Sequence, residues 1–193
     1  MALRAERRKS ARGVAVCAVF AAAALALSYL EFLIPINLII PLPGVKLGLA
    51  NLAVVLALVY VSPYAAILVS VVRVALSSLL FGSPTSFALS LGGAALSLAV
   101  MLALYAAARQ GVKMSYLGLC IASAAAHSAG QICAACILFA SAALVAYMPV
   151  LMLFSILTGG ATGILLNLSV PLTDRAVKNF GFGNRKRNKT DEK

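Results

Sequence analysis

Long runs of apolar residues, each about as long as a membrane span, restrict what this sequence can fold into. A helix needs roughly 20 apolar residues to cross the hydrocarbon core of a bilayer. Applied along the chain, this length predicts six spans. They cover residues 14–34, 45–61, 63–81, 85–108, 115–140 and 146–172. The sequence therefore predicts an all-α integral membrane protein, a bundle of six transmembrane helices.

The composition supports this class and leaves little chain for anything else. Hydrophobic residues make up 63% of the 193 residues and charged residues 11%, and the mean hydropathy is +1.02. Soluble domains average about half apolar and a quarter charged residues. We expect a basic N-terminal arm (1–13), a six-helix membrane domain (14–172) and a basic C-terminal tail (173–193). A separate catalytic domain does not fit in the remaining length.

Serine–proline pairs mark the expected starts of two helices. Ser62-Pro63 and Ser83-Pro84 each place a hydroxyl side chain just before a proline. Serine is a preferred N-cap, and proline is well tolerated at the first helical position. The third and fourth spans should therefore begin almost directly after the spans that precede them. Gly111 is placed to terminate the fourth span as a C-cap.

The positive charges predict the orientation of the bundle. The formal net charge is +11, but nearly all Lys and Arg residues lie in the two terminal segments and in the loop at 109–113. Positively charged loops remain cytoplasmic. With six spans, all three segments fall on one side, so both termini are predicted to be cytoplasmic. The charge thus reports topology rather than a nucleic-acid partner. The first run is long for a signal peptide and is expected to stay attached.

The connection at residues 35–44 is long, apolar and interrupted by three prolines. Proline lacks an N–H and fixes φ, so this segment cannot be a continuous helix. Irregular backbone at membrane depth is tolerated where it is buried in protein or lines a cavity. One interpretation is a lid over a cavity open to the outside. The other is an interfacial loop resting on lipid headgroups.

Seven polar or ionisable side chains lie within the apolar runs or at their ends. Such groups are costly in a membrane and by default mark a ligand or ion path. Asn167 falls near the cytoplasmic end of its span, where interhelical hydrogen bonding is the simplest role. The other six fall in the middle or outer half of the membrane and are the predicted substrate-binding residues. They are Glu31, Lys46, Asn51, Arg73, His127 and Gln131.

Each of these groups also has a purely structural interpretation. Arg73 carries a permanent charge and a planar fork of donors, suited to a carboxylate or phosphate, but it could instead pair internally with Glu31. Lys46 could extend to the interface, and His127 could be a core histidine or a proton-linked group. The fixed charges of Lys46, Arg73 and Glu31 leave one net positive charge. This favours an anionic or zwitterionic small molecule over a cation.

Small residues on the first span predict a close helix contact. Ala18, Ala22 and Ala26 recur every four residues, a pattern that lets helices approach closely within a chain or between chains. The pair Cys133 and Cys136 lies in an apolar run, where cysteine usually acts as a small hydrophobe, so no metal site is expected.

Motifs for catalysis are lacking in the sequence. Only Glu31 among the five acidic residues lies in the membrane region, and no P-loop or Ser-His-Asp set is present. We therefore expect no enzyme activity and no cofactor in this chain.

Several segments resemble the Gx transporter family, also labelled heptaprenyl diphosphate synthase component I. The resemblance is carried by PGVKLGLAN at residues 43–51, by RVALSSLLFG and SPTSF across residues 73–87, and by AHSAGQ at residues 126–131. It covers roughly residues 14–172. The family commonly has Asn where Ser128 stands.

This family is similar to the substrate-binding (S) components of energy-coupling factor (ECF) transporters. The resemblance implies a multi-pass protein of a prokaryotic plasma membrane that captures a micronutrient or isoprenoid-related molecule at its outer face. It also implies that the alanine-rich face of the first helix docks a transmembrane coupling subunit joined to ATPases, which would use the ATP. The alternative, implied by the family's second label, is a non-catalytic membrane partner of a polyprenyl diphosphate synthase.

Overall fold

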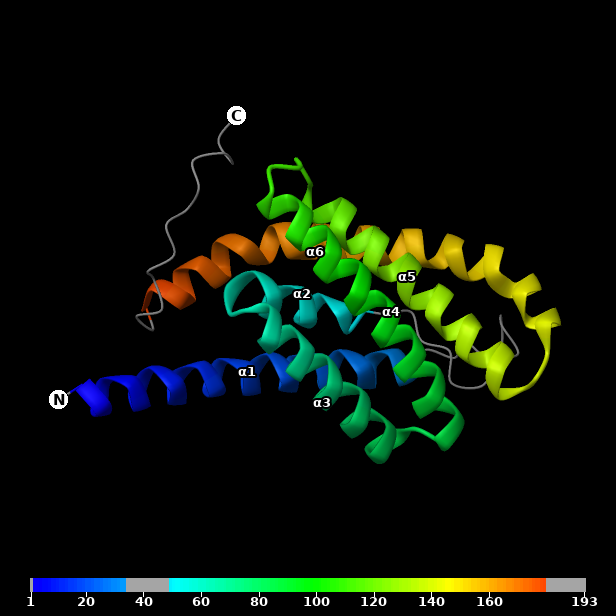
Figure 1. Ribbon diagram of the computed structural model, residues 1–193, viewed down its shortest axis with the longest axis horizontal. Helices are drawn as coiled ribbons and strands as arrows, with labels where there is room; N and C mark the ends of the chain where they lie inside the picture. Colours follow the sequence, from blue (N-terminus) through cyan, green and yellow to red (C-terminus); the bar gives the residue numbers. More distant parts are fainter. Residues whose placement is uncertain (1, 34–48, 180–193) are drawn as a thin grey trace.

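The computed structural model describes the backbone of residues 2–33 and 49–179, and the side chains of residues 13–33 and 49–171. Within these ranges the chain is helical apart from short connections (Figure 1). The helices are α1 (Ala2–Leu33), α2 (Asn51–Tyr60), α3 (Pro63–Phe81), α4 (Pro84–Arg109), α5 (Tyr116–Leu138), the 3₁₀ helix η2 (Ala142–Tyr147) and α6 (Met148–Asn179).

Five helical segments of the described chain are long and apolar enough to cross a membrane. They correspond to the first, third, fourth, fifth and sixth predicted spans. The second differs, because Leu49 and Ala50 form a turn and α2 begins only at Asn51. At 1.5 Å per residue, α2 is about 15 Å long, roughly half of the hydrocarbon thickness. The helical membrane class is confirmed, whereas a full second span over 45–61 is not found in the part of the chain that is described.

The serine–proline pairs begin helices where the sequence predicts. Ser62 Oγ accepts a hydrogen bond of 3.1 Å from the backbone N–H of Ala65, and Ser83 Oγ accepts one of 3.1 Å from Ser86. Each bond satisfies one of the amides that the first turn leaves without a helical partner. At the other end of α4, Gly111 has a φ of +101°, the left-handed conformation expected after a helix C-cap.

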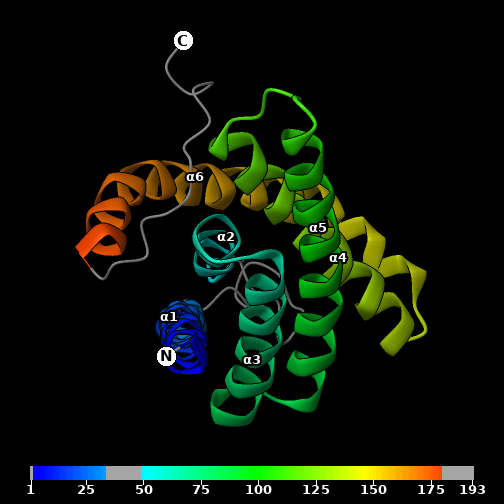
Figure 2. The same cartoon turned by 60° about the vertical axis from the view of Figure 1, so that its left-hand side comes forward.

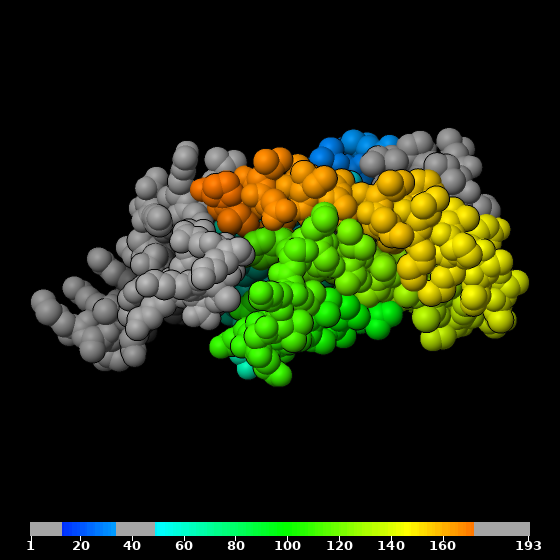
Figure 3. All heavy atoms as spheres, turned by 90° about the horizontal axis from the view of Figure 1, so that it is seen from above, coloured from blue at the N-terminus to red at the C-terminus, as the bar shows by residue number. Residues whose placement is uncertain are grey.

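Contacts between glycine-bearing surfaces hold α4, α5 and α6 together. A Cβ on Gly92 of α4 would lie 2.8 Å from the carbonyl oxygen of Gly130 on α5, so the two backbones touch. On α6, Cβ atoms on Gly159 and Gly163 would lie 2.7 and 2.9 Å from Cα atoms of α5. Glycine permits this close approach, which gives van der Waals contact where lipid offers no hydrophobic driving force. α6 accordingly runs beside α5 along one face of the molecule (Figure 3).

The short helix α2 lies at the centre of the bundle, beside α1, α3 and α6 (Figure 2). Six of its ten residues are buried, and its last turn is tied to α6 because the hydroxyl of Tyr60 donates to the carbonyl of Val170 over 3.0 Å. α2 is therefore packed like an interior element and not like a helix facing lipid.

The start of α1 and the end of α6 lie at one end of the molecule, which we call the termini end (Figure 1). The turn between α3 and α4 lies at the opposite, hairpin end. The main apolar core occupies the termini half of the interior. Its buried members include Ala24, Val55, Leu58, Val69, Met101, Leu119 and Leu166. Because the start of α1 and the end of α6 share one end, an even number of crossings fits the described chain, and their cytoplasmic side stays a prediction.

Candidate substrate-binding site

Five of the six predicted substrate-binding residues are buried in the bundle. Their exposed fractions are 2% for Glu31, 8% for Asn51, 3% for Arg73, 1% for His127 and 0% for Gln131. They come from α1, α2, α3 and α5. Glu31, Asn51 and Gln131 lie in the hairpin half of their helices, and Arg73 and His127 lie near the middle of theirs. The sixth residue, Lys46, and the lid predicted at 35–44 lie outside the described residues.

Buried serines extend this polar interior onto α4, a helix for which the sequence analysis named no binding residue. On α4, Ser86, Ser90 and Ser97 are buried along one stripe with Gly93. Their spacing of four, three and four residues is that of one helix face. This spacing was the available signal for α4, but serine is common in membrane helices and single serines do not stand out. Further buried serines of this interior are Ser28, Ser70, Ser77 and Ser123.

A chain of hydrogen bonds joins three helices across the middle of the bundle. The side-chain amide of Asn51 donates to the hydroxyl of Ser97 over 3.2 Å, and that hydroxyl lies 2.9 Å from the hydroxyl of Ser123. The chain thus runs from α2 through α4 to α5. All three groups are buried, so the bonds satisfy polar atoms that lipid and apolar neighbours cannot. This set fixes the depth at which the start of α2 meets the other helices.

Glu31 links the end of α1 to the turn before α2. Its Oε1 accepts a hydrogen bond from the backbone N–H of Leu49. Glu31 also attracts Arg73 electrostatically, which places the negative side chain near the positive one in the interior. Next to this corner, the ring of Phe81 at the end of α3 packs against Tyr29 and Phe32 of α1, with centroid distances of 5.6 and 5.8 Å. Aromatic contacts therefore hold the two hairpin-end helix termini together.

Arg73 has more hydrogen-bonding capacity than its described surroundings use. Its Nε and Nη2 make no hydrogen bond with any residue in the described ranges, although Arg73 is only 3% exposed. A buried guanidinium stays charged, and leaving its donors without acceptors is costly. On α4, the buried hydroxyl of Ser90 likewise makes no hydrogen bond with a described residue. The interior thus holds a cation and a hydroxyl with donors to offer.

His127 and Gln131 lie against α4 at a glycine. A Cβ on Gly93 would be 2.8 Å from Cε1 of His127 and 2.8 Å from Cγ of Gln131. The two side chains share one face of α5, being four residues apart. Gly93 therefore leaves the room in which both side chains sit.

The order of contacts along the antiparallel helices places these groups at one level. Val74 and Ala94 line a common groove between α3 and α4, while Gly93 faces His127 on α5. Arg73 precedes the turn at Gly82 by nine residues and Gly93 follows Ser83 by ten, so both lie at a similar distance from the turn that joins α3 and α4. A cation, an imidazole and an amide consequently surround a single layer of the bundle, a set suited to holding an anionic group by charge and hydrogen bonds.

Four further positions fall outside this layer. Ser128 lies on the side of α5 that faces α6, where its hydroxyl is 2.5 Å from that of Ser155, and Ser155 in turn donates to the carbonyl of Leu151. Ser128 therefore belongs to the α5–α6 contact. Asn167 is exposed on α6, so it does not form the hydrogen bond within the bundle that we expected. Cys133 is exposed as well and Cys136 half-buried, both with free thiols.

The face of α1 predicted to dock a partner is accessible. Ala18, Ala22 and Ala26 are all exposed, while Ala24, Ser28 and Glu31 form the buried face of the same helix. The three alanine side chains therefore point away from the bundle, and no described helix of this chain covers them. Among the described residues, no three His, Cys, Asp or Glu side chains are grouped to hold a metal.

Comparison with known proteins gives one family. The model of the family described as heptaprenyl diphosphate synthase component I matches residues 20–169, which include α2 to α5 complete, the second part of α1 and most of α6. No curated protein and no solved structure was similar enough to count as a match. The matched range contains every residue of the polar layer described above.

Proposed function

Since this chain belongs to the heptaprenyl diphosphate synthase component I family, also called the Gx transporter family, we propose that it is the substrate-binding subunit of an ECF-type ATP-driven importer. In this role it holds a small anionic or zwitterionic molecule, a micronutrient or an isoprenoid-related compound, in a cavity at the outer side of a prokaryotic plasma membrane. The chain itself performs no catalysis and hydrolyses no ATP.

The observation that carries this proposal is the buried guanidinium of Arg73, with donors unused by the described residues. Glu31 attracts Arg73 electrostatically, but its Oε1 accepts from the backbone of Leu49, and no described carboxylate oxygen bonds Nε or Nη2 of Arg73. An anionic ligand would supply the missing acceptors, and Ser90 would add a hydroxyl. Intramembrane charge that is kept at such cost usually serves a ligand.

The proposed partners are a transmembrane coupling subunit and two ATPases. The exposed alanines of α1, Ala18, Ala22 and Ala26, support this part of the proposal because a flat face of small residues permits close packing of a foreign helix. The chain has no sequence motif for binding ATP, so the energy for uptake must come from such partners.

A second candidate function is a non-catalytic membrane partner of a polyprenyl diphosphate synthase. The family's description favours it directly. The basic residues near both termini also suit it, because they offer a charged surface to a soluble enzyme, although attraction to anionic lipid accounts for them equally.

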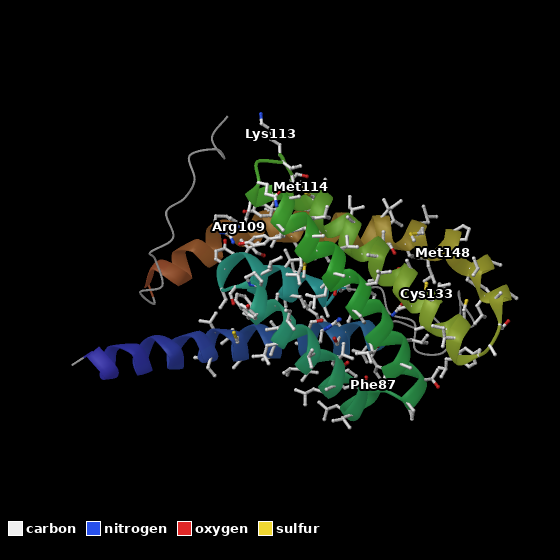
Figure 4. All side chains as sticks on the ribbon, in the orientation of Figure 1. Phe87, Arg109, Lys113, Met114, Cys133 and Met148 are labelled. Carbon is white, nitrogen blue, oxygen red and sulfur yellow. The ribbon has the colours of Figure 1, made fainter. Side chains whose placement is uncertain are left out.

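The experiment for the binding site compares Arg73→Ala and Arg73→Lys with the unchanged protein. Small molecules retained during gentle purification are identified by mass spectrometry, and the bound compound is then added back in a thermal-unfolding assay. We expect Arg73→Ala to abolish the ligand-induced rise in Tm and Arg73→Lys to keep part of it, since lysine retains the charge but not the planar fork. Arg109→Ala, at the exposed end of α4 (Figure 4), is the matched control. An undiminished rise in Arg73→Ala would remove Arg73 from the site.

Affinity capture from native membranes separates the two candidate functions. Co-purification of a coupling subunit with ATPases supports the importer, whereas recovery of a prenyl synthase alone supports the second function. Substituting Ala22→Phe on the exposed face of α1 should block the first kind of complex and leave ligand binding intact. Equal recovery of the complex with Ala22→Phe would exclude this face as the docking surface.

A further inference from the structure

A groove of about 270 Å³ runs between α3 and α4. Nine residues line it, and Ser70 is the one polar member. Its floor is formed by small or buried side chains such as Ala94 and Val74, and Phe87 and Leu91 on its rim are exposed. Both helices are long and apolar enough to span a membrane, in which the groove would face the hydrocarbon core.

The groove backs directly onto the polar layer of the binding site. On α3, the lining residues Ser70 and Val74 flank Arg73, whose own side chain is buried on the inner face. On α4, Ala94 lies one turn from the buried Ser90, on the same helix face. Each wall of the groove therefore carries, just behind its apolar lining, one side chain with hydrogen-bond donors that no described residue accepts.

The size of the groove suits part of a ligand and not a whole one. Pockets that hold entire small molecules have volumes of roughly 300 to 1,000 Å³, above the value here. The groove extends along α4 from Phe87 to Leu98, which is about 16 Å at the rise of an α-helix. Phe87 marks its hairpin end in Figure 4. A narrow, elongated, apolar channel of this kind fits a hydrocarbon chain.

We propose that the ligand is an amphiphile whose anionic head, a phosphate or carboxylate, binds Arg73 and Ser90 while its hydrocarbon tail lies in the α3–α4 groove. This inference rests on the proposed binding function and names the substrate class. Lipid chains are as apolar as the groove lining, so the tail adds to the affinity through close packing in the groove and not through a hydrophobic driving force. Head and tail both contribute to binding, and the groove keeps the tail out of the polar layer.

The test uses the full chain in nanodiscs of neutral phosphatidylcholine, with four probes. Geranylgeranyl phosphate carries head and prenyl tail, lysophosphatidic acid carries a phosphate and an acyl tail, inorganic phosphate carries the head alone, and geranylgeraniol carries the tail alone. We expect measurable binding only when head and tail are joined. The stronger of the first two probes identifies the source of the tail. Binding of inorganic phosphate as tight as that of both tailed phosphates would overturn the proposal.

Variants then assign the two parts of the ligand to the two parts of the site. Ala95→Phe fills the groove from its exposed, lipid-facing side and should weaken binding of the tailed phosphate about tenfold. Ala103→Phe, exposed on the same helix outside the groove, is the matched control and should change nothing. Thermal unfolding of each variant verifies that it is folded. Unchanged affinity in folded Ala95→Phe would overturn the groove assignment.

These experiments distinguish an error in the substrate class from an error in the proposed binding function. If a tail-less compound binds in an Arg73-dependent way and Ala95→Phe has no effect on it, the substrate class is wrong while the binding function stands. If Arg73→Ala alters the binding of no probe and of no retained compound, the binding function itself fails.

Discussion

The two ends of the bundle have opposite interiors, although the same helices pass through both. On α3, Ala66 and Val69 face the interior at the termini end, whereas Arg73 and Ser77 face it at the hairpin end. α1 and α4 change in the same direction, from Ala24 to Ser28 on α1 and from Met101 to Ser97 on α4. α5 and α6 differ, because they carry a second, smaller apolar cluster around Ile132 and Leu151. The change from apolar to polar is therefore shared by three of the long helices.

This comparison separates the residues that stabilise the fold from those proposed to bind the ligand. In lipid, buried apolar side chains associate through close packing, and polar ones are costly unless they are bonded. The termini half contains the large fully buried residues Leu58 and Met101 and can fix the helix arrangement by packing. The hairpin half keeps a charge and several hydroxyls that contribute little to packing. We therefore expect substitutions in the first half to change stability and those in the second to change binding.

The largest effect should follow a cavity in the apolar half. Leu58→Ala removes a fully buried side chain from α2 and should lower the free energy of unfolding by about 2–5 kcal/mol. Ligand affinity of the folded fraction should stay unchanged. Leu165→Ala, on the exposed side of α6, is the control and should change stability by about 0.5 kcal/mol or less. Chemical unfolding in mild detergent provides the measurement. Equal losses in the two variants would contradict the distinction between the interiors.

The contact between the backbones of α4 and α5 should be the next most sensitive. Gly130→Ala places a methyl group against the carbonyl of Gly92, and separating the helices should cost about 1–3 kcal/mol. Gly160→Ala is a matched control on α6, because a Cβ there meets nothing within 4 Å. That variant should be neutral or more stable, since alanine favours helix. The prediction fails if Gly130→Ala unfolds at the same denaturant concentration as Gly160→Ala.

In the polar half, Gly93→Ala should weaken binding as well as stability. The new methyl group would lie 2.8 Å from side-chain atoms of His127 and Gln131 and 2.9 Å from the backbone oxygen of His127, so both residues must shift within the layer that holds the ligand. We expect the Kd of the retained ligand to rise about tenfold. Isothermal titration gives the affinity, and unfolding in the same preparation gives the stability. A large loss of stability with unchanged Kd would place Gly93 among the packing residues instead.

The smallest effect concerns the hydrogen-bond chain from Asn51 to Ser123. Ser97→Ala removes its middle member and should cost about 0.6 kcal/mol, the typical value for interhelical bonds in membranes. Ser169→Ala is the control, because that hydroxyl bonds only the carbonyl of Leu165 on its own helix. A double-mutant cycle with Asn51→Ala isolates the coupling. Additive losses would show that the chain does not act as a unit.

Local signals in the sequence predicted the helix starts well. Ser62 and Ser83 cap their helices as expected, because an N-cap depends on a few neighbouring residues and not on the rest of the fold. The burial of Arg73 and His127 was also predictable, since polar groups in a span avoid lipid. Asn167 shows the limit of that rule, because near a helix end the polar headgroups are within reach and exposure costs less.

Features that depend on three-dimensional contacts were not predictable. Hydropathy alone does not mark the start of α2, because Leu49 and Ala50 in the preceding turn are as apolar as the helix itself. The stripe of serines on α4 was missed because a hydroxyl can bond its own helix, so its presence does not reveal which way it faces. The contacts of Gly93 with His127 and Gln131, and of Ser97 with Ser123, show that this face is internal.

The shortness of α2 has an electrical consequence. A helix that crossed the whole membrane would leave its positive amino-terminal pole in the headgroups, whereas α2 begins at Asn51 beside the polar layer. Its first residue is preceded by Ala50, which offers no capping side chain, so Glu31 is the anion at that pole. Half a span of backbone thereby adds positive potential to the layer around Arg73, and any incoming anion must share that potential with Glu31.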